Sequence, residues 1–154
     1  MSKNWEKRFL TPEEVAEMEN VFNERFFSFI KRDENIFIEG GCEEEVLYIT
    51  LILKNTDESF YYPFETSISK NDNPNLNFED AKSILLDFIG AYFEQYFSSD
   101  RDTFISIVWS EFNCEGIKFY ARGQVVNKKA EDLADNFLKE KGYNDKGDKN
   151  GGND

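Results

Sequence analysis

Residues 46–69 read VLYITLILKNTDESFYYPFETSIS, and this stretch decides the fold. Residues 46–53 are apolar on both sides of the strand alternation, which is typical of a central strand or of one covered on both faces. Residues 55–58 supply turn chemistry, and residues 60–69 place bulky side chains at every second position. The stretch therefore predicts a hairpin. Because Pro63 cannot donate a ladder hydrogen bond, we predict that its strand lies at a sheet edge.

One helix is predicted before this hairpin in the chain and another after it. Thr11 is an N-cap residue followed by proline and, three positions later, by Glu14, which is the pattern of a capping box. Apolar residues at steps of three and four then carry the helix to about Lys31. Asn77 is the expected N-cap of a second helix that reaches about Phe97, and its apolar arc is wider than an ordinary amphipathic stripe.

Further elements complete an α-β-β-β-α-β-β-α order. We predict a short strand over 36–38 closed by a turn at Gly40-Gly41, two strands over 104–112 and 117–126, and a third helix after Asn127. Strands joined by tight turns favour antiparallel pairing, so the prediction is an α+β fold. Its five-stranded antiparallel sheet carries helices packed mainly on one face. Residues 1–143 form a single α+β domain in this interpretation, and residues 144–154 form a disordered polar tail.

The sequence contains no motif that names a reaction. Histidine is absent, which removes the most common general base near neutral pH and a frequent metal ligand. Neither of the glycine-rich phosphate-binding motifs is present, and the two cysteines lie far apart. We therefore lean against an enzyme, and expect no catalytic residues, metal ligands or cofactor. We expect two structural thiols; a disulfide between Cys42 and Cys114 and a reactive Cys42 beside the two glycines stay open as alternatives.

Charge restricts the partners. The chain has 31 acidic and 18 basic residues, a net charge of −13, and nearly all of the excess falls within residues 1–100. Such a surface repels nucleic-acid phosphates and anionic lipids, and attracts basic partners at low salt. We expect no direct nucleic-acid binding. Without an apolar run long enough for a membrane span or a signal peptide, we expect a cytoplasmic protein with no membrane contact.

Aromatic residues give the positive functional signal, because 23 side chains are Phe or Tyr. Tyrosine and tryptophan suit protein interfaces, and arginine beside exposed aromatics often anchors them. For the helical tyrosines, the alternative is that they are core residues with hydroxyls at the rim. The predicted partner surface comprises Tyr61, Tyr92, Tyr96, Trp109, Tyr120 and Arg122.

The element order, small size and acidity of residues 11–142 together resemble the class I chaperones of type III secretion and the related YbjN-like sensory regulators. The resemblance is one of architecture, and it carries over no functional residue. It implies a homodimer whose apolar grooves hold an extended segment of a client protein, without a cofactor.

The leading functional hypothesis is a non-catalytic protein-binding module, or chaperone-like adaptor, that uses an aromatic patch with an acidic rim. The alternative is an acidic inhibitor, such as an immunity protein or a DNA mimic, that blocks a basic site. A carboxylate- or Cys-dependent enzyme and a structural subunit of a larger assembly remain as further alternatives. Salt separates the first two, because binding by charge mimicry weakens steeply as ionic strength rises.

Overall fold

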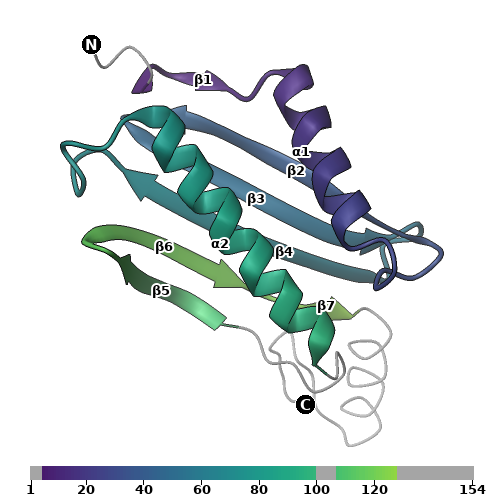
Figure 1. Ribbon diagram of the computed structural model, residues 1–154. Helices are drawn as coiled ribbons and strands as arrows, with labels where there is room; N and C mark the ends of the chain where they lie inside the picture. Colours follow the sequence, from purple (N-terminus) through teal and green to yellow (C-terminus); the bar gives the residue numbers. More distant parts are fainter. Residues whose placement is uncertain (1–4, 100–106, 128–154) are drawn as a thin grey trace, which may run out of the picture.

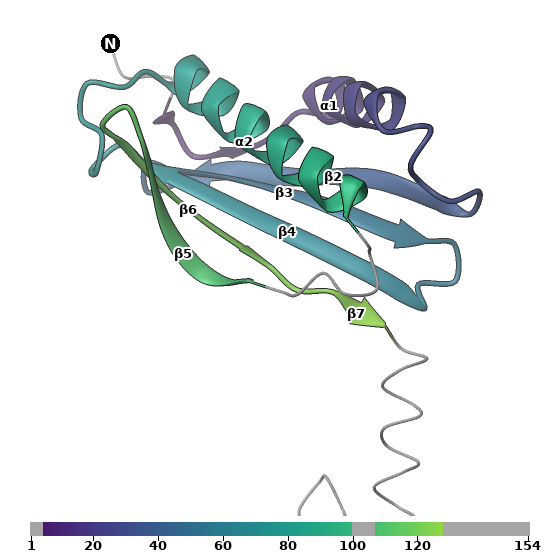
Figure 2. The ribbon, with the colours of Figure 1, turned by 60° about the horizontal axis from the view of Figure 1, so that its bottom comes forward.

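The computed structural model describes residues 5–99 and 107–127, which form an antiparallel sheet with two helices on one face (Figures 1 and 2). In chain order the elements are β1 (Arg8–Phe9), α1 (Pro12–Arg25), β2 (Glu34–Glu43), β3 (Val46–Asn55), β4 (Phe60–Ser69), α2 (Phe78–Ser98), β5 (Ile107–Cys114), β6 (Ile117–Gly123) and β7 (Val126–Asn127).

The strands follow the spatial order β1-β2-β3-β4-β6-β5, and β7 pairs with β4 beyond the end of β6. All of these pairs are antiparallel, so the predicted α+β class with an antiparallel sheet is confirmed. The predicted number of strands is wrong, because two-residue strands β1 and β7 join the five longer ones. The predicted third helix, the polar tail and residues 104–106 of the predicted fourth strand lie outside the described residues.

Both helices begin at the predicted caps. Thr11 accepts a hydrogen bond from the Glu14 N–H at 3.1 Å, and the Glu14 carboxylate accepts one from the Thr11 N–H at 2.9 Å. Asn77 accepts from the Asp80 N–H at 2.8 Å. These bonds satisfy N–H groups that a helix start leaves without an intrahelical partner.

The first helix ends at Arg25, which corrects the prediction that it continues to Lys31. The Phe26 side chain is buried, and its ring centroid lies 5.1 Å from that of Phe97. The chain then turns back toward the sheet. The carboxylate of Glu34 accepts a hydrogen bond from the Lys31 N–H at 2.8 Å and holds this reversal. Apolar residues beyond Arg25 matched the helical period, but they pack in a turn.

Gly40 and Gly41 lie inside β2, which corrects the predicted turn at these residues. A Cβ on Gly41 would approach the Arg8 carbonyl oxygen to 2.7 Å, and one on Gly40 would approach the Leu10 side chain to 3.0 Å. The glycines therefore allow β1 and Leu10 to lie close alongside β2, and a Cβ on Gly40 would also approach the Tyr48 carbonyl oxygen of β3 to 2.5 Å. The hairpin turn comes later, at Glu44 and Glu45.

Pro63 lies in a central strand, which corrects the predicted edge position. It pairs with Ile52 of β3, and its carbonyl oxygen accepts a hydrogen bond from the Gln124 N–H at 3.4 Å. Because the N–H and C=O of one strand residue point the same way, the missing donor faces the same side as Gln124. Gln124 lies in the gap between β6 and β7, where the sheet needs no N–H donor from residue 63.

A layer of large side chains fills the space between helices and sheet. On β4, the ring of Phe64 stacks 4.0 Å from Tyr92, and Tyr62 lies 5.1 Å from Tyr96, both on α2. The fully buried side chains include Phe26, Ile36, Leu47, Ile49, Leu51, Leu53, Tyr62, Phe64, Ile68, Phe78, Phe93 and Tyr96. No helix in the described ranges is long and apolar enough to cross a membrane.

Side chains of α1 close the outer edge of β2. The Asn23 amide donates to the Ile36 carbonyl oxygen at 2.9 Å and accepts from the Ile36 N–H at 3.0 Å. Glu19 accepts from the Ile38 N–H at 2.9 Å, and the Leu10 N–H donates to the Gly40 carbonyl at 3.0 Å. This edge is thereby blocked against pairing with another strand.

Asn23→Ala removes both bonds to Ile36 and leaves a strand N–H and C=O without their partners. We expect a loss of about 1–3 kcal/mol in the free energy of unfolding, measured with urea. Asn23→Asp retains an acceptor for the Ile36 N–H but loses the donor, and should fall between Ala and wild type. Equal stability of all three proteins would contradict this role.

Glutamates occupy strained positions in the hairpin turns. Glu44 and Glu45 have φ of 54° and 60°, Glu58 has 58°, and Glu115 has 52° next to Gly116 at 85°. This is the left-handed region, where glycine and asparagine are favoured and other L-residues carry a steric cost. Two-residue turns with both φ values positive match the twist of a hairpin, and Asn-Gly is their preferred sequence.

Replacing the turn pair with Glu44→Asn and Glu45→Gly should raise the free energy of unfolding by roughly 1 kcal/mol per position and the melting temperature by a few degrees. Gly116→Ala should lower stability by a similar amount, because Gly116 has a positive φ. Thermal unfolding followed by circular dichroism measures both. Shifts of the same sign would refute the strain argument.

Candidate functional site

The sheet face opposite the helices, here called the open face, is not covered by any element that the structure describes (Figure 2). Strand register places its members, because residues paired across antiparallel strands share a face. The large uncharged side chains of the open face are Phe37, Tyr48, Ile52, Tyr61, Pro63, Trp109 and Tyr120. Its charged side chains are Glu39, Glu43, Lys54, Glu65, Glu111, Lys118 and Arg122.

Arg122 of β6 organises a cluster on this face with Glu65 of β4 and Trp109 of β5. Its guanidinium group donates to both carboxylate oxygens of Glu65, from Nε at 3.2 Å and from Nη2 at 3.3 Å. The Cζ atom also lies 5.1 Å from the ring centroid of Trp109, a cation–π distance. Trp109 remains 47% exposed. A planar cation held between a carboxylate and an indole forms a preorganised contact surface.

An apolar row adjoins this cluster. Phe37, Ile52 and Pro63 face one another across β2, β3 and β4, and the Lys54 ammonium lies 5.0 Å from the Phe37 ring centroid. Ile52 is only 5% exposed, whereas Phe37 is 38% exposed. The row thus has a well-packed middle and an accessible aromatic end.

The structure divides the predicted partner surface between two faces. Tyr61, Trp109, Tyr120 and Arg122 lie together on the open face. Tyr92 and Tyr96 lie on the other side of the sheet, between α2 and β4, where Tyr96 is fully buried. We therefore leave Tyr92 and Tyr96 out of the candidate site.

Tyr92 is held in the core by its hydroxyl, which shares a short hydrogen bond with that of Tyr62. Burial raises the pKa of both phenols above the ordinary value of 10, and the shared bond raises the pKa of Tyr62 further. Both groups therefore stay neutral at physiological pH. This pair is a buried polar link between β4 and α2, not an acid or base.

Sequence reasoning missed Phe37, Tyr48, Ile52 and Pro63 as parts of the open face. The sequence predicts only a short strand over 36–38, whose three apolar residues show no alternation between two faces. Residues 46–53 are apolar on both faces, so Ile52 could not be separated from the core side. Register supplies the missing signal, because Pro63, Ile52 and Phe37 align only once the three strands are paired.

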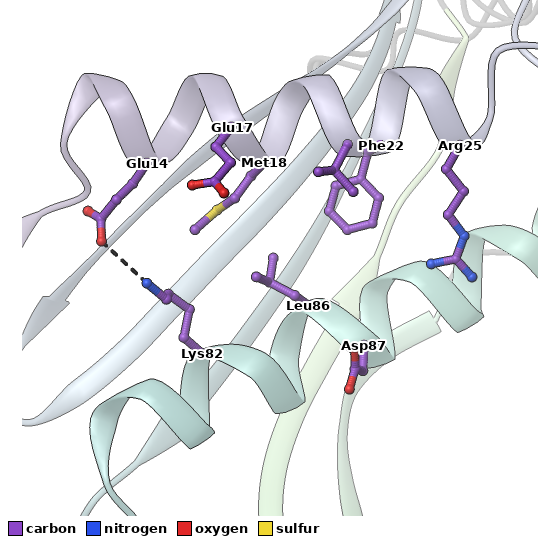
Figure 3. A pocket seen from close by; sticks show the side chains of 9 residues that line it. Glu14, Glu17, Met18, Phe22, Arg25, Lys82, Leu86 and Asp87 are labelled. Atoms are coloured by element: carbon purple, nitrogen blue, oxygen red, sulfur yellow. Dashed lines mark hydrogen bonds and ion pairs between the residues drawn. The ribbon is translucent and has the colours of Figure 1, made fainter.

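A groove of about 310 Å³ runs between α1 and α2 on the helical side (Figure 3). Its apolar floor comprises Met18, Phe22 and Leu86. Lys82 lies near one end with its ammonium 3.4 Å from the Glu14 carboxylate, and Arg25 lies at the other end, 3.4 Å from Glu94. Because both cations are engaged within the protein, an anionic ligand would have to displace existing ion pairs. The groove is a weaker candidate than the open face.

Glu14 connects three elements beside this groove. Its carboxylate receives two hydrogen bonds from the Arg8 guanidinium, at 2.8 and 3.2 Å, besides the Thr11 and Lys82 contacts. The Arg8 hydrogen bond is the main cause that lowers the pKa of Glu14 from 4.5 to about 2. The folded state therefore favours the ionised form.

Glu14→Gln should lower stability at pH 7 by about 1–2 kcal/mol, allowing for partial solvent screening. The lowered pKa of Glu14 contributes stability above about pH 4.5, and this contribution is lost as pH falls toward 2. The difference between wild type and variant should therefore shrink across this window in urea unfolding. Glu13→Gln, at an exposed position of the same turn, is the control. A pH-independent difference would contradict the assignment.

Cys42 is part of the core. It is 2% exposed, its Sγ donates to the Trp5 carbonyl oxygen at 3.4 Å, and burial raises the pKa of its thiol. These features disfavour a nucleophilic thiolate. Within residues 5–99 and 107–127, no group of three acidic or thiol side chains is arranged to hold a metal ion.

Comparisons of the chain with protein-family models, with curated proteins and with solved structures find no match. The architectural resemblance to the class I chaperones of type III secretion therefore finds no support in them. The candidate site consequently depends on the geometry of this chain alone.

Proposed function

We propose that this protein is a non-catalytic binding module that holds a protein partner against the open face of its sheet. The observation that carries the proposal is the exposed Trp109 stacked on an Arg122 that is itself fixed by Glu65. Tryptophan, tyrosine and arginine dominate binding energy at protein interfaces. A restrained arginine loses less side-chain entropy on binding than a free one.

The chemistry of the face indicates the kind of partner. Phe37, Tyr61 and Pro63 offer apolar contact area. Glu39 lies beside Phe37 on the same face of β2, and Glu111 of β5 lies opposite Tyr120. The whole chain carries a net charge of −13. The charged side chains of the face itself are of both signs, so the acidic charge of the whole chain would steer the association of a partner that carries lysine or arginine beside its apolar contact residues, more than it would fix the affinity.

Tyr120→Ala and Arg122→Ala should each abolish capture of the same proteins from native lysate, because they remove the Arg122 anchor and the tyrosine beside it on the same face of β6. Their melting temperatures should stay close to wild type, since an exposed ion pair contributes little stability. Affinity purification read by mass spectrometry, with thermal unfolding of each variant, measures both effects.

Phe27→Ala provides the matched control, because Phe27 is 77% exposed and lies in the turn after α1, outside the strands that form the open face. It should retain the captured proteins. Retention by all variants alike would refute the open face as the site. Partners that survive a high-salt wash support apolar capture, whereas partners lost in salt favour the acidic-inhibitor alternative.

A further inference from the structure

The outer edge of β5 differs from the closed edge of β2. Among the described strands, β5 pairs with β6 on one side and with none on the other. Figure 1 shows it at the sheet margin opposite β1 and β2. A strand edge with unpaired N–H and C=O groups is a template for pairing with another strand.

The β5–β6 hairpin determines which backbone groups point outward. Its turn has two residues, so the flanking Cys114 and Ile117 form a hydrogen-bonded pair. By alternation, Phe112 also bonds toward β6, while Glu111 and Asn113 direct their N–H and C=O groups away from it. The bulge between Ile107 and Ser110 confines the regular edge to residues 110–114.

We propose that a second copy of this chain pairs antiparallel with β5 about a two-fold axis at Phe112, which joins the two sheets into one. Glu111 of one copy then lies opposite Asn113 of the other, and these outward-pointing residues exchange hydrogen bonds. Phe112 faces its own counterpart on the side that carries the helices. Residue 110 lies opposite residue 114.

Charge selects this register. A two-fold axis at Glu111 would oppose two glutamates, and one at Asn113 would oppose Glu111 to Glu115, both unfavourable. With the axis at Phe112, the Asn113 Oδ1 already accepts from the Gly116 N–H at 3.2 Å, so its amide NH₂ can donate to the Glu111 carboxylate. The two Phe112 rings form an aromatic cross-strand pair, which is favourable in antiparallel sheets.

The edge and the residues that test partner capture are separable, because strand pairing engages Glu111 but leaves Tyr120 and Arg122 of β6 outside the contact between the copies. Each copy carries a net charge of −13, so long-range repulsion opposes dimerisation. Added salt screens this repulsion and should strengthen the dimer. Capture of a basic partner by the open face would weaken under the same conditions, and the two interactions thus respond to salt with opposite signs.

Sedimentation of the purified full-length chain tests the dimer without any partner. We expect a concentration-dependent dimer whose dissociation constant falls as salt rises. Glu111→Pro should abolish it, because proline removes an outward N–H that makes no bond to β6 and is tolerated at strand edges. Glu111→Gln keeps that N–H and should still dimerise. Circular dichroism verifies the fold of both variants.

A cysteine pair tests the register independently. Cys114 is free and exposed, and Ser110→Cys places a thiol opposite Cys114 of the second copy. Opposed residues that are not hydrogen-bonded have Cα atoms about 4.5 Å apart, within the range of a disulfide. Oxidised glutathione should therefore yield a covalent dimer on a non-reducing gel, with glutathione reduced in exchange. Adding Cys114→Ser should prevent it.

Three results would overturn the proposal. These are a wild-type chain that sediments as a monomer at every concentration and salt, a Glu111→Pro variant that dimerises like Glu111→Gln, and the absence of a crosslink between residues 110 and 114. None of them affects partner capture by the open face, so failure of the dimer is distinguishable from failure of the proposed function.

Discussion

Backbone hydrogen bonding at the sheet margins constrains this fold more than any single apolar contact. A marginal strand must find partners for its N–H and C=O groups or leave them to solvent. Asn23 acts as a substitute strand residue for β2, with one amide serving both backbone groups of Ile36. Asn73 does the same for Lys118 of β6, at 2.9 Å to both its N–H and its carbonyl. Neither asparagine belongs to a strand.

Through these two side-chain amides, segments outside the strands help to determine how the sheet is built. Asn23 requires α1 to lie along β2, so the chain must reverse soon after Arg25. Asn73 stands where the β4–β6 ladder stops at Ser67 and Tyr120, and it continues that ladder with a side chain. The sheet can therefore splay after this point without leaving Lys118 unpaired.

Local signals in the sequence were sufficient where a few neighbouring residues determine the outcome. The capping residues Thr11 and Asn77 start helices through bonds made within three residues, and the structure confirms both. Alternation in residues 60–69 likewise separates Tyr62 and Phe64 from Tyr61, as observed. The antiparallel α+β class followed from these elements.

The predictions were wrong at residues whose conformation depends on a segment far away in the sequence. Gly40 and Gly41 match a turn in the sequence, but β1 pairs closely beside them; Pro63 matches an edge residue, but it lies in a central strand opposite the gap between β6 and β7. The candidate site shows the same limit. Tyr92 and Tyr120 have similar local surroundings in the sequence, but only pairing and packing place one in the core and the other on the open face.

The two tryptophans occupy opposite environments, and this gives the molecule two built-in optical probes. Trp5 is 3% exposed and packs edge-on against Phe78, whereas Trp109 lies on the open face over Arg122. Emission from the buried indole follows the integrity of the core, and emission from the exposed one follows the polarity at the sheet surface. Fluorescence can therefore separate loss of folding from occupation of the face in a single unlabelled sample.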